Sequence, residues 1–164
     1  MFKDYRVEIK WAIYYSIFLL IWFVTEKIFG LHDERIALQQ NVSFFLLIPT
    51  VAFYVLEMVN KRKQFYSGRM TYFQGFISGI IYTVCIMILT PLVQFICYFI
   101  ISPGYFKNLV DYSVSTGVYN NVQAAQQFTF GNFLFINEVF IMLTGVVFAA
   151  FIPLFLLSAN NDNK

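Results

Sequence analysis

Charged residues are scarce in this chain, and their scarcity excludes a soluble globular protein. They make up 12% of its 164 residues, about half of the ~25% that is usual in soluble domains. Apolar residues make up 59%, and 21 residues are phenylalanine. A soluble domain of this length could not bury so much apolar surface in one core, whereas a lipid-facing surface accommodates it. The net charge of +2 is too small to predict a nucleic-acid partner.

Residues that carry chemistry are also rare. His32 is the one histidine, and because Asp33 and Glu34 follow it directly, the three side chains cannot all face one metal ion. Cys85 and Cys97 share one apolar run, about 18 Å apart along a helix, which is too far for a disulfide. No GxSxG, HExxH, phosphate-loop or CxxC motif is present. We therefore expect no enzyme activity, no metal, no cofactor and no identifiable small-molecule ligand.

Long apolar runs are what the chain has instead. They cover about 11–29, 42–59, 72–101 and 133–157. Each is within or above the roughly 17–25 residues with which a helix crosses a bilayer, and the alternation of a β-barrel is absent. We predict an all-α integral membrane four-helix bundle that forms a single domain over residues 1–164. The first run has the charged start of a signal peptide but lacks the small residues of a cleavage site, so we expect a retained helix.

The basic residues predict the orientation of the bundle. The tails and the loop between the second and third runs share one side of a four-helix protein, and they hold eight Lys and Arg residues against three on the other side. Four of the eight follow the second run, at Lys61, Arg62, Lys63 and Arg69. Since cytoplasmic loops carry the excess of Lys and Arg, we predict that both ends of the chain are cytoplasmic.

Glycine and proline mark expected boundaries. Gly30 predicts the end of the first helix, as a glycine just past a helix end does. Pro49 and Pro91 fall inside the second and third runs and predict kinks there. A short helical lead-in over 34–40 is expected to continue into the second helix.

The outer loop between the third and fourth runs has a helical pattern of its own. Ser102 and Pro103 predict an N-cap with proline at the first helical position. The apolar spacing over 105–110 predicts a short amphipathic helix on the outer surface. The polar, uncharged stretch 113–127 is typical of a loop or of a second short surface helix.

Small residues recur four apart on the third and fourth runs. They are Gly75, Gly79 and Thr83 on the third and Gly145 and Ala149 on the fourth. Such spacing permits close approach of helix backbones in lipid. One hypothesis is that these faces pack the third helix on the fourth, and the alternative is a homodimer face.

Acidic residues inside apolar runs are candidate sites, because a carboxylate in lipid is costly. We expect Glu57 to pair with Lys61 one turn later. Glu26, beside Lys27, is interpreted as a hydrated residue of the membrane boundary. Glu138 is left with Asn137 as its polar neighbour and, across the bundle, with Gln94, and these three form a possible polar site.

Two segments around the third run carry a resemblance. The segment Ser67–Gly79 (SGRMTYFQGFISG) opens that run, and Ile101–Phe106 (ISPGYF) closes it. They resemble an uncharacterised bacterial membrane-protein family, the domain of unknown function family 4199, whose third helix opens with T-F-x-x-(A/G)-F-x-x-G and closes with I-x-P-x-Y. The extra Tyr72 makes the opening an approximate match, and the resemblance is sharpest over Gly68–Tyr112. It implies a small integral protein of the bacterial inner membrane, and it does not point to any activity, ligand or catalytic residue.

Three function hypotheses follow. The first is a non-enzymatic membrane protein with a structural role, or one that assembles with a membrane-protein partner or a second copy of itself. The second is a small carrier or channel that acts as an oligomer through the polar residues of the third and fourth helices. A carrier would show repeated halves, and 1–60 does not match 71–157. The third, a lipid-modifying enzyme, lacks an acid–base pair, so the first is preferred.

The predicted orientation is testable with reporters. We expect fusions after Lys63 and Lys164 to be active with a cytoplasmic reporter, and a fusion after Val118 to be active with a periplasmic one. The reason is the excess of Lys and Arg on the first side. Periplasmic activity after Lys63 would reverse the assignment.

Overall fold

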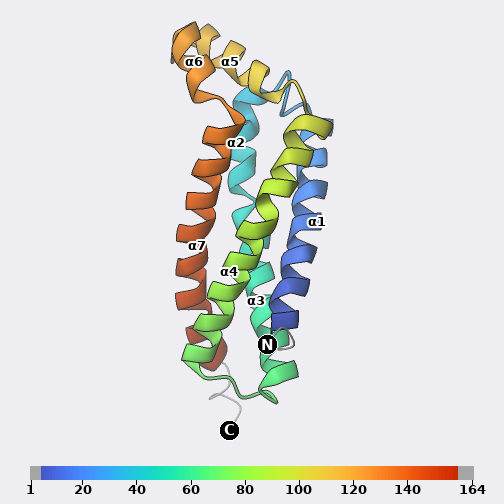
Figure 1. Cartoon of the computed structure of the whole chain (residues 1–164), viewed down its shortest axis with the longest axis vertical. Coiled ribbons are helices and arrows are strands. Elements are labelled where there is room, and N and C mark those ends of the chain that lie inside the picture. The colour runs from blue at the N-terminus through green and yellow to red at the C-terminus, as the bar shows by residue number, and fades with distance from the viewer. Residues whose placement is uncertain (1–4, 159–164) are drawn as a thin grey trace.

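The structure is a long helical bundle (Figure 1). The computed structural model describes residues 5–158, and within them it is all-helical, with 84% helix and no strand. The elements are α1 (Arg6–Ile28), α2 (Ile36–Phe44), α3 (Leu47–Phe65), α4 (Tyr72–Phe95), the π-helix η2 (Ile96–Ile101), α5 (Tyr105–Ser115), α6 (Asn121–Gln127) and α7 (Phe130–Ser158). The predicted all-α class is confirmed.

Four helical segments are long and apolar enough to cross a membrane. They are Arg6–Ile28, Ile36–Phe65, Tyr72–Ile101 and Phe130–Leu156. The start of α1, the α3–α4 loop and the end of α7 lie at one end of the bundle, which is called the terminal end below, and α5 and α6 form a cap at the other (Figure 1). This is the arrangement of a multi-pass membrane protein with an even number of spans. Lys3 and Lys164, which entered the charge count, lie outside the described residues.

The second span consists of two helices, because the helix is interrupted between α2 and α3 at Phe45 and Leu46. Pro49 is the third residue of α3 and has no N–H to donate to the Phe45 carbonyl four residues earlier. A kink was expected at this proline, and the interruption falls one turn before it. The lead-in helix begins at Ile36 and ends at the break.

The third span runs without a break to Ile101, and its last turns are π-helical. It begins with a capping box: the Thr71 hydroxyl accepts from the Gln74 N–H, and the Gln74 side chain accepts from the Thr71 N–H. The prediction that Ser102 caps the next helix is wrong, because α5 begins at Tyr105 with Gly104 as its N-cap. Ser102 instead terminates the π-helix by donating its N–H to the Cys97 carbonyl, and its hydroxyl accepts from Lys27 Nζ at 3.3 Å.

The outer loop contains two short helices, so the second alternative for the stretch 113–127, a further short helix, is the one that the structure has. α5 covers the predicted 105–110 and extends to Ser115, and α6 covers part of 113–127 with Asn120 as its cap. Gly30 follows α1 with a φ of +74°, a left-handed conformation that glycine adopts at no steric cost.

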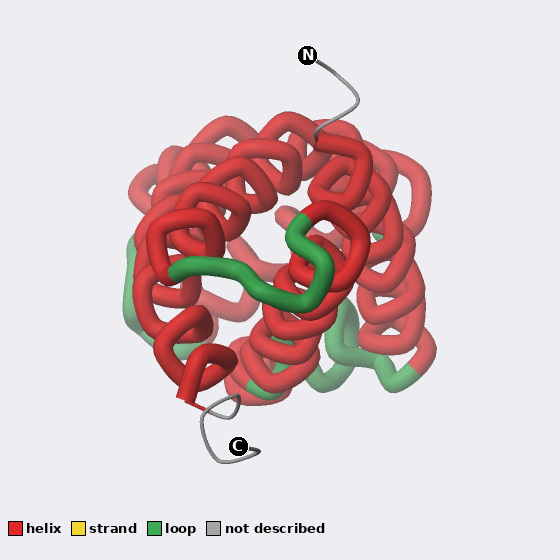
Figure 2. The backbone as a smooth tube through the Cα atoms, turned by 90° about the horizontal axis from the view of Figure 1, so that it is seen from below, coloured by secondary structure: helices red, strands yellow, loops and turns green. Residues whose placement is uncertain are grey.

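The small residues of α4 and α7 meet one another. A methyl group added at Gly79 would lie 2.7 Å from Ala149 Cβ, and one at Gly75 would lie 2.9 Å from Pro153 Cβ. At Gly145 the same methyl would collide with the Thr83 side chain. The two helices therefore pack face to face along these positions, as the first of the two packing hypotheses proposed. Figure 2 looks along the bundle from its terminal end and shows the spanning helices side by side.

α4 is the central helix, since it packs on α1, α3 and α7. The buried cluster around it includes Tyr54, Met58, Tyr82 and Ile86. The Tyr54 hydroxyl lies 2.8 Å from Thr83 Oγ1, so a hydrogen bond joins α3 to α4 beside the contact with α7. Elsewhere the helices expose large apolar side chains, as lipid-facing surfaces do.

Replacing Gly79 by Leu tests the close contact of α4 and α7. Because the added side chain would meet Ala149 and Met58, we expect a loss of about 1–3 kcal/mol in the free energy of unfolding in detergent. Gly131→Leu is the matched control, since nothing lies within 4 Å of a methyl group there. Equal melting temperatures for the two variants would contradict the packing.

Candidate functional site

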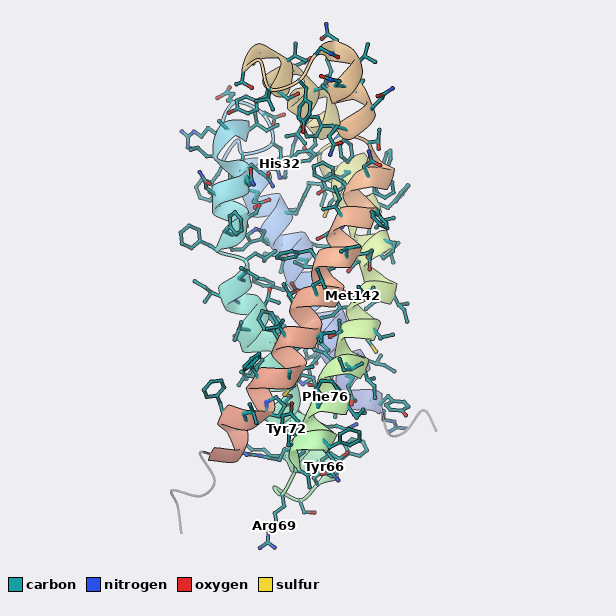
Figure 3. The ribbon with its side chains drawn as sticks, turned by 90° about the vertical axis from the view of Figure 1, so that its left-hand side faces the viewer. His32, Tyr66, Arg69, Tyr72, Phe76 and Met142 are labelled. Atoms are coloured by element: carbon teal, nitrogen blue, oxygen red, sulfur yellow. The ribbon has the colours of Figure 1, made fainter. Side chains whose placement is uncertain are left out.

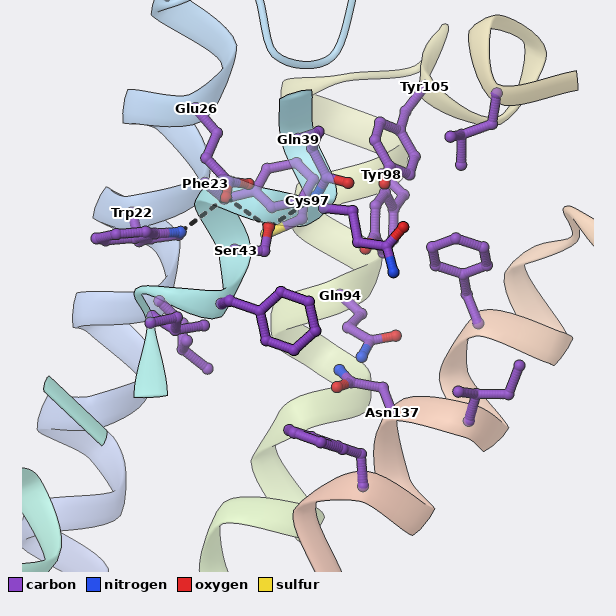
Figure 4. A pocket seen from close by; sticks show the side chains of 18 of the residues that line it. Trp22, Phe23, Glu26, Gln39, Ser43, Gln94, Cys97, Tyr98, Tyr105 and Asn137 are labelled. Atoms are coloured by element: carbon purple, nitrogen blue, oxygen red, sulfur yellow. Dashed lines mark hydrogen bonds between the residues drawn. The ribbon is translucent and has the colours of Figure 1, made fainter. Parts of the chain in front are cut away.

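A cavity of about 720 Å³ occupies the half of the bundle nearest the cap (Figure 4). Side chains from α1, α2, α3, α4, η2, α5 and α7 line it. Tyr15, Tyr54 and Thr144 are among the lining residues towards the middle of the bundle, and Tyr112 and Thr116 of α5 lie at the cap. Its volume is within the roughly 300–1,000 Å³ of small-molecule sites.

The position of the cavity follows from the sequence of α7. From Gly145 to Pro153 this helix presents small residues or proline to α4, and the backbones approach closely. Nearer the cap, α7 lines the cavity with the larger residues Asn137, Phe140 and Ile141. Figure 3 shows α2 and α7 apart near the cap, whereas towards the terminal end α7 packs on α3.

Glu26 is the polar centre of one cavity wall. It is only 4% exposed, and its Oε1 accepts from Trp22 Nε1 and from Ser43 Oγ, both at 2.8 Å. The Ser43 hydroxyl accepts in turn from Gln39 Nε2 at 3.0 Å. On the other side, Glu26 Oε2 lies 3.4 Å from His32 Nε2. The interpretation of Glu26 as a solvated boundary residue is therefore wrong, because α2 folds over it.

His32 lies behind Glu26 and is fully buried. Its ring is 4.3 Å from that of Phe23 and 5.2 Å from that of Tyr105. Asn108 of α5 donates to the His32 carbonyl and to Asp33, both at 2.8 Å, and so holds the cap on the α1–α2 loop. Within residues 5–158, no group of three or more His, Cys, Asp or Glu side chains is placed to hold a metal ion.

The cap closes the cavity with aromatic rings. Tyr105 is 1% exposed and packs against Tyr98 of the π-helix at 5.0 Å between ring centres. Burial, and secondarily the nearby Glu26 carboxylate, raises the pKa of the Tyr105 phenol above its usual value. The phenol therefore stays neutral, and this wall adds no charge to the cavity.

Two of the three residues of the predicted polar site meet in the cavity. Gln94 of α4 and Asn137 of α7 both line it, and Figure 4 shows their amides on facing helices. Gln94 is 6% exposed, and its Oε1 is buried without a hydrogen-bond partner. A buried amide without a partner is costly, so this carbonyl is available to a ligand donor.

Glu138 is placed apart from that pair. It does not line the cavity, since it follows Asn137 on the helix and points about 100° away from it. Its side chain is partly buried, and its Oε1 lacks a hydrogen-bond partner.

The predicted pair of Glu57 with Lys61 is replaced by an arrangement across helices. Lys61 Nζ lies 2.8 Å from Oε1 of Glu8, at the start of α1. Glu57 Oε1 is reached instead by the Ser78 hydroxyl of α4 at 2.9 Å. Lys61 pairs with Glu8 and not with Glu57 because α1, α3 and α4 converge here. A pair between Glu57 and Lys61 along one helix face would leave the Glu8 carboxylate buried without its counter-charge.

The other basic residues that predicted the orientation differ in their surroundings. Arg62 donates through Nη1 to the Leu156 carbonyl of α7 at 3.1 Å. Lys63 and Arg69 are exposed at the terminal end. Two of the four thus hold helices together as well as contributing charge.

Sequence reasoning missed most of the cavity wall. Trp22 lies four residues before Glu26, a helical spacing that signals a hydrogen bond. Ser43 and Gln39 gave no signal, because the fold-back of α2 over α1 depends on the break after Phe44. Thr50 is likewise seen only in the structure, where its hydroxyl lies 3.0 Å from that of Tyr15.

Glu26→Ala tests the wall that Glu26 organises. The change would leave the Trp22, Ser43 and His32 groups without their acceptor, so we expect a loss of about 2 kcal/mol or more in unfolding free energy in detergent. Glu34→Ala, on an exposed residue of the adjoining loop, is the control and should leave the melting curve unchanged. Similar curves for the two variants would show that the network contributes nothing.

Comparison with known proteins agrees with the resemblance seen in the sequence. A family model described as "Protein of unknown function (DUF4199)" matches residues 10–159. No curated protein and no solved structure matches the chain. The match runs from Lys10 of α1 to the end of α7 and includes the other three spans, the cap and the cavity. The chain therefore belongs to the DUF4199 family of proteins of unknown function.

Proposed function

We propose that this chain is a multi-pass protein of the bacterial inner membrane, with both ends in the cytoplasm, that binds an uncharged lipid-like amphiphile in the cavity. The single observation that carries the proposal is the cavity itself, about 720 Å³ with the unpartnered Gln94 carbonyl and the Asn137 amide on its wall. A mostly apolar cavity with a few polar groups is typical of small-molecule sites.

The lining supports an uncharged ligand. Among the described residues that line the cavity, none is basic, and Glu26 alone bears a carboxylate. That carboxylate is already engaged by Trp22 and Ser43, with His32 beside it. A charged headgroup would find no free counter-charge there, whereas an amide, hydroxyl or carbonyl group could hydrogen-bond to Gln94 and Asn137.

The surface around the cavity supports access from the lipid. Phe44 of α2 and Ile136 and Phe140 of α7 line the cavity and are also 59%, 54% and 48% exposed. Exposed apolar residues at an opening favour hydrocarbon over water outside it. We therefore propose that the ligand enters sideways, between α2 and α7, from the outer leaflet.

Binding is favoured over the other hypotheses by particular residues. The small-residue faces that suggested a homodimer are occupied by α4 and α7 of the same chain, which leaves assembly with a partner without a supporting contact. His32 is fully buried behind Glu26 and does not line the cavity, so we propose no lipid-modifying reaction. A carrier role, the second hypothesis, would use the same cavity.

Native mass spectrometry of the protein purified from its own membranes tests the proposal. We expect an uncharged lipid to remain bound to the wild-type protein and to be lost from Thr144→Trp, because the indole would occupy part of the cavity and obstruct the ligand. Gln94→Leu, which keeps the size and removes the hydrogen-bonding group, should reduce occupancy by about fivefold or more, corresponding to about 1 kcal/mol.

Val147→Trp is the matched control, since Val147 is 50% exposed on the same helix and does not line the cavity. Val147→Trp should retain the lipid. Each of the three variants should unfold in a single cooperative transition, which shows that it is folded. Equal lipid occupancy in Thr144→Trp and Val147→Trp would contradict the cavity as the binding site.

A further inference from the structure

A second buried polar cluster lies at the terminal end of the bundle, away from the cavity. It joins Glu8 of α1, Glu57 of α3 and Ser78 of α4, all at most 2% exposed. The Ser78 hydroxyl lies 2.9 Å from Glu8 Oε1 and 2.9 Å from Glu57 Oε1. Lys61 Nζ contacts Glu8 at 2.8 Å and 3.1 Å through its two oxygens.

The two contacts of the Ser78 hydroxyl need more protons than the serine itself supplies. A serine hydroxyl carries one proton and can donate it to one carboxylate. At 2.9 Å the second carboxyl oxygen can be hydrogen-bonded only if it brings a proton and donates to the serine oxygen. With both carboxyl groups ionised, one of the two contacts would set a lone pair against a lone pair.

We propose that Glu8, Ser78 and Glu57 form a proton-binding site in which Glu57 carries the proton at neutral pH. The Glu57 carboxyl group then donates a hydrogen bond to the Ser78 oxygen, and the Ser78 hydroxyl donates one to Glu8. The proton is assigned to Glu57 and not to Glu8 because Lys61 is paired with Glu8. When the site releases its proton, two ionised carboxyl groups face each other across the serine.

The second oxygen of Glu57 supports this assignment independently. Glu57 Oε2 is buried and has no hydrogen-bond partner. An ionised carboxylate oxygen in that position would lack both water and a donor, which is costly in a membrane interior. A neutral carboxyl group, protonated on the Oε1 that faces Ser78, leaves less charge unpaired at Oε2.

A route for the proton leads to the terminal end. A hollow of about 430 Å³ is lined by Glu8, Lys61 and Ser78, together with Phe65 and Phe73. The last two are 39% and 68% exposed, so the hollow reaches the surface of the bundle. The site therefore exchanges protons with the side of the membrane on which the α3–α4 loop lies.

Groups from α1, α3 and α4 surround Glu57. Among the described residues, the groups that titrate or carry charge near it are Glu8 of α1, Lys61 of α3, the phenols of Tyr54 and Tyr82 on α3 and α4, and the Cys85 thiol of α4. From α7 the Leu156 carbonyl accepts from Arg62 near the end of α3. Lys61 is thus the cation closest to the two carboxyl groups, and it is engaged with Glu8.

Infrared spectroscopy of the full chain in lipid nanodiscs tests the site. At neutral pH we expect a protonated-carboxyl C=O band that shifts in deuterium oxide and disappears in Glu57→Gln. Glu138→Gln removes a carboxyl group from another span and controls for the Glu138 contribution. Absence of any such band at neutral pH, or a band that survives unchanged in Glu57→Gln, overturns the proposal.

The pH dependence of melting gives a second measurement that does not depend on band assignment. The folded protein would hold a proton that the unfolded chain releases, so stability should fall as the pH is raised. From pH 6 to pH 9 we expect the wild-type melting temperature to fall by about 5 °C more than that of Glu57→Gln. A glutamine amide replaces the neutral acid, so this variant should fold. Parallel pH profiles for the two proteins contradict the site.

Discussion

The contact between α4 and α7 sets the shape of the whole bundle. Gly79 and Gly145 leave no room for even a methyl group, so the two helices touch at their backbones over the half nearest the terminal end. Close approach matters in lipid, where packing rather than the hydrophobic effect holds helices together. Nearer the cap the same helices carry Gln94 and Asn137, and there the space between them and α2 stays open.

The two halves of the protein consequently have different chemistry. In the half nearest the terminal end, Glu8 pairs with Lys61 and accepts from Ser78, and a hollow lies at the end of the bundle. In the half nearest the cap, the hydrogen bonds lie in the wall around Glu26, and the Gln94 carbonyl in the cavity lining has no hydrogen-bond partner. The half nearest the terminal end therefore suits the proposed proton-binding site, and the half nearest the cap suits the proposed amphiphile.

Periodicity and composition were sufficient to predict the fold class, because each span has to satisfy its backbone within itself. The sequence also pointed to the glycines of α4 and α7 and to Gln94 and Asn137. The sequence did not reveal that Lys61 pairs with Glu8 and not with Glu57. A Glu–Lys pair on one helix face is a complete explanation until the structure shows that Glu8 of α1 lies beside the same lysine. It did not reveal the Ser43 contact with Glu26 either, because that contact depends on where the second span breaks.

The break at Phe45 and Leu46 divides the second span mechanically. α2 is fastened to α1 through Ser43 and Glu26 and packs on α5, while α3 is fastened to α4 through Tyr54 and Thr83. The covalent neighbours α2 and α3 are thus held by different contacts, α2 by the outer end of α1 and by the cap, and α3 by α4 and by the first half of α1. A bend at this joint would change the width of the space between α2 and α7, and the Ser43–Glu26 hydrogen bond resists it, because α1 is one unbroken helix that is also bonded to α3 through Tyr15 and Thr50.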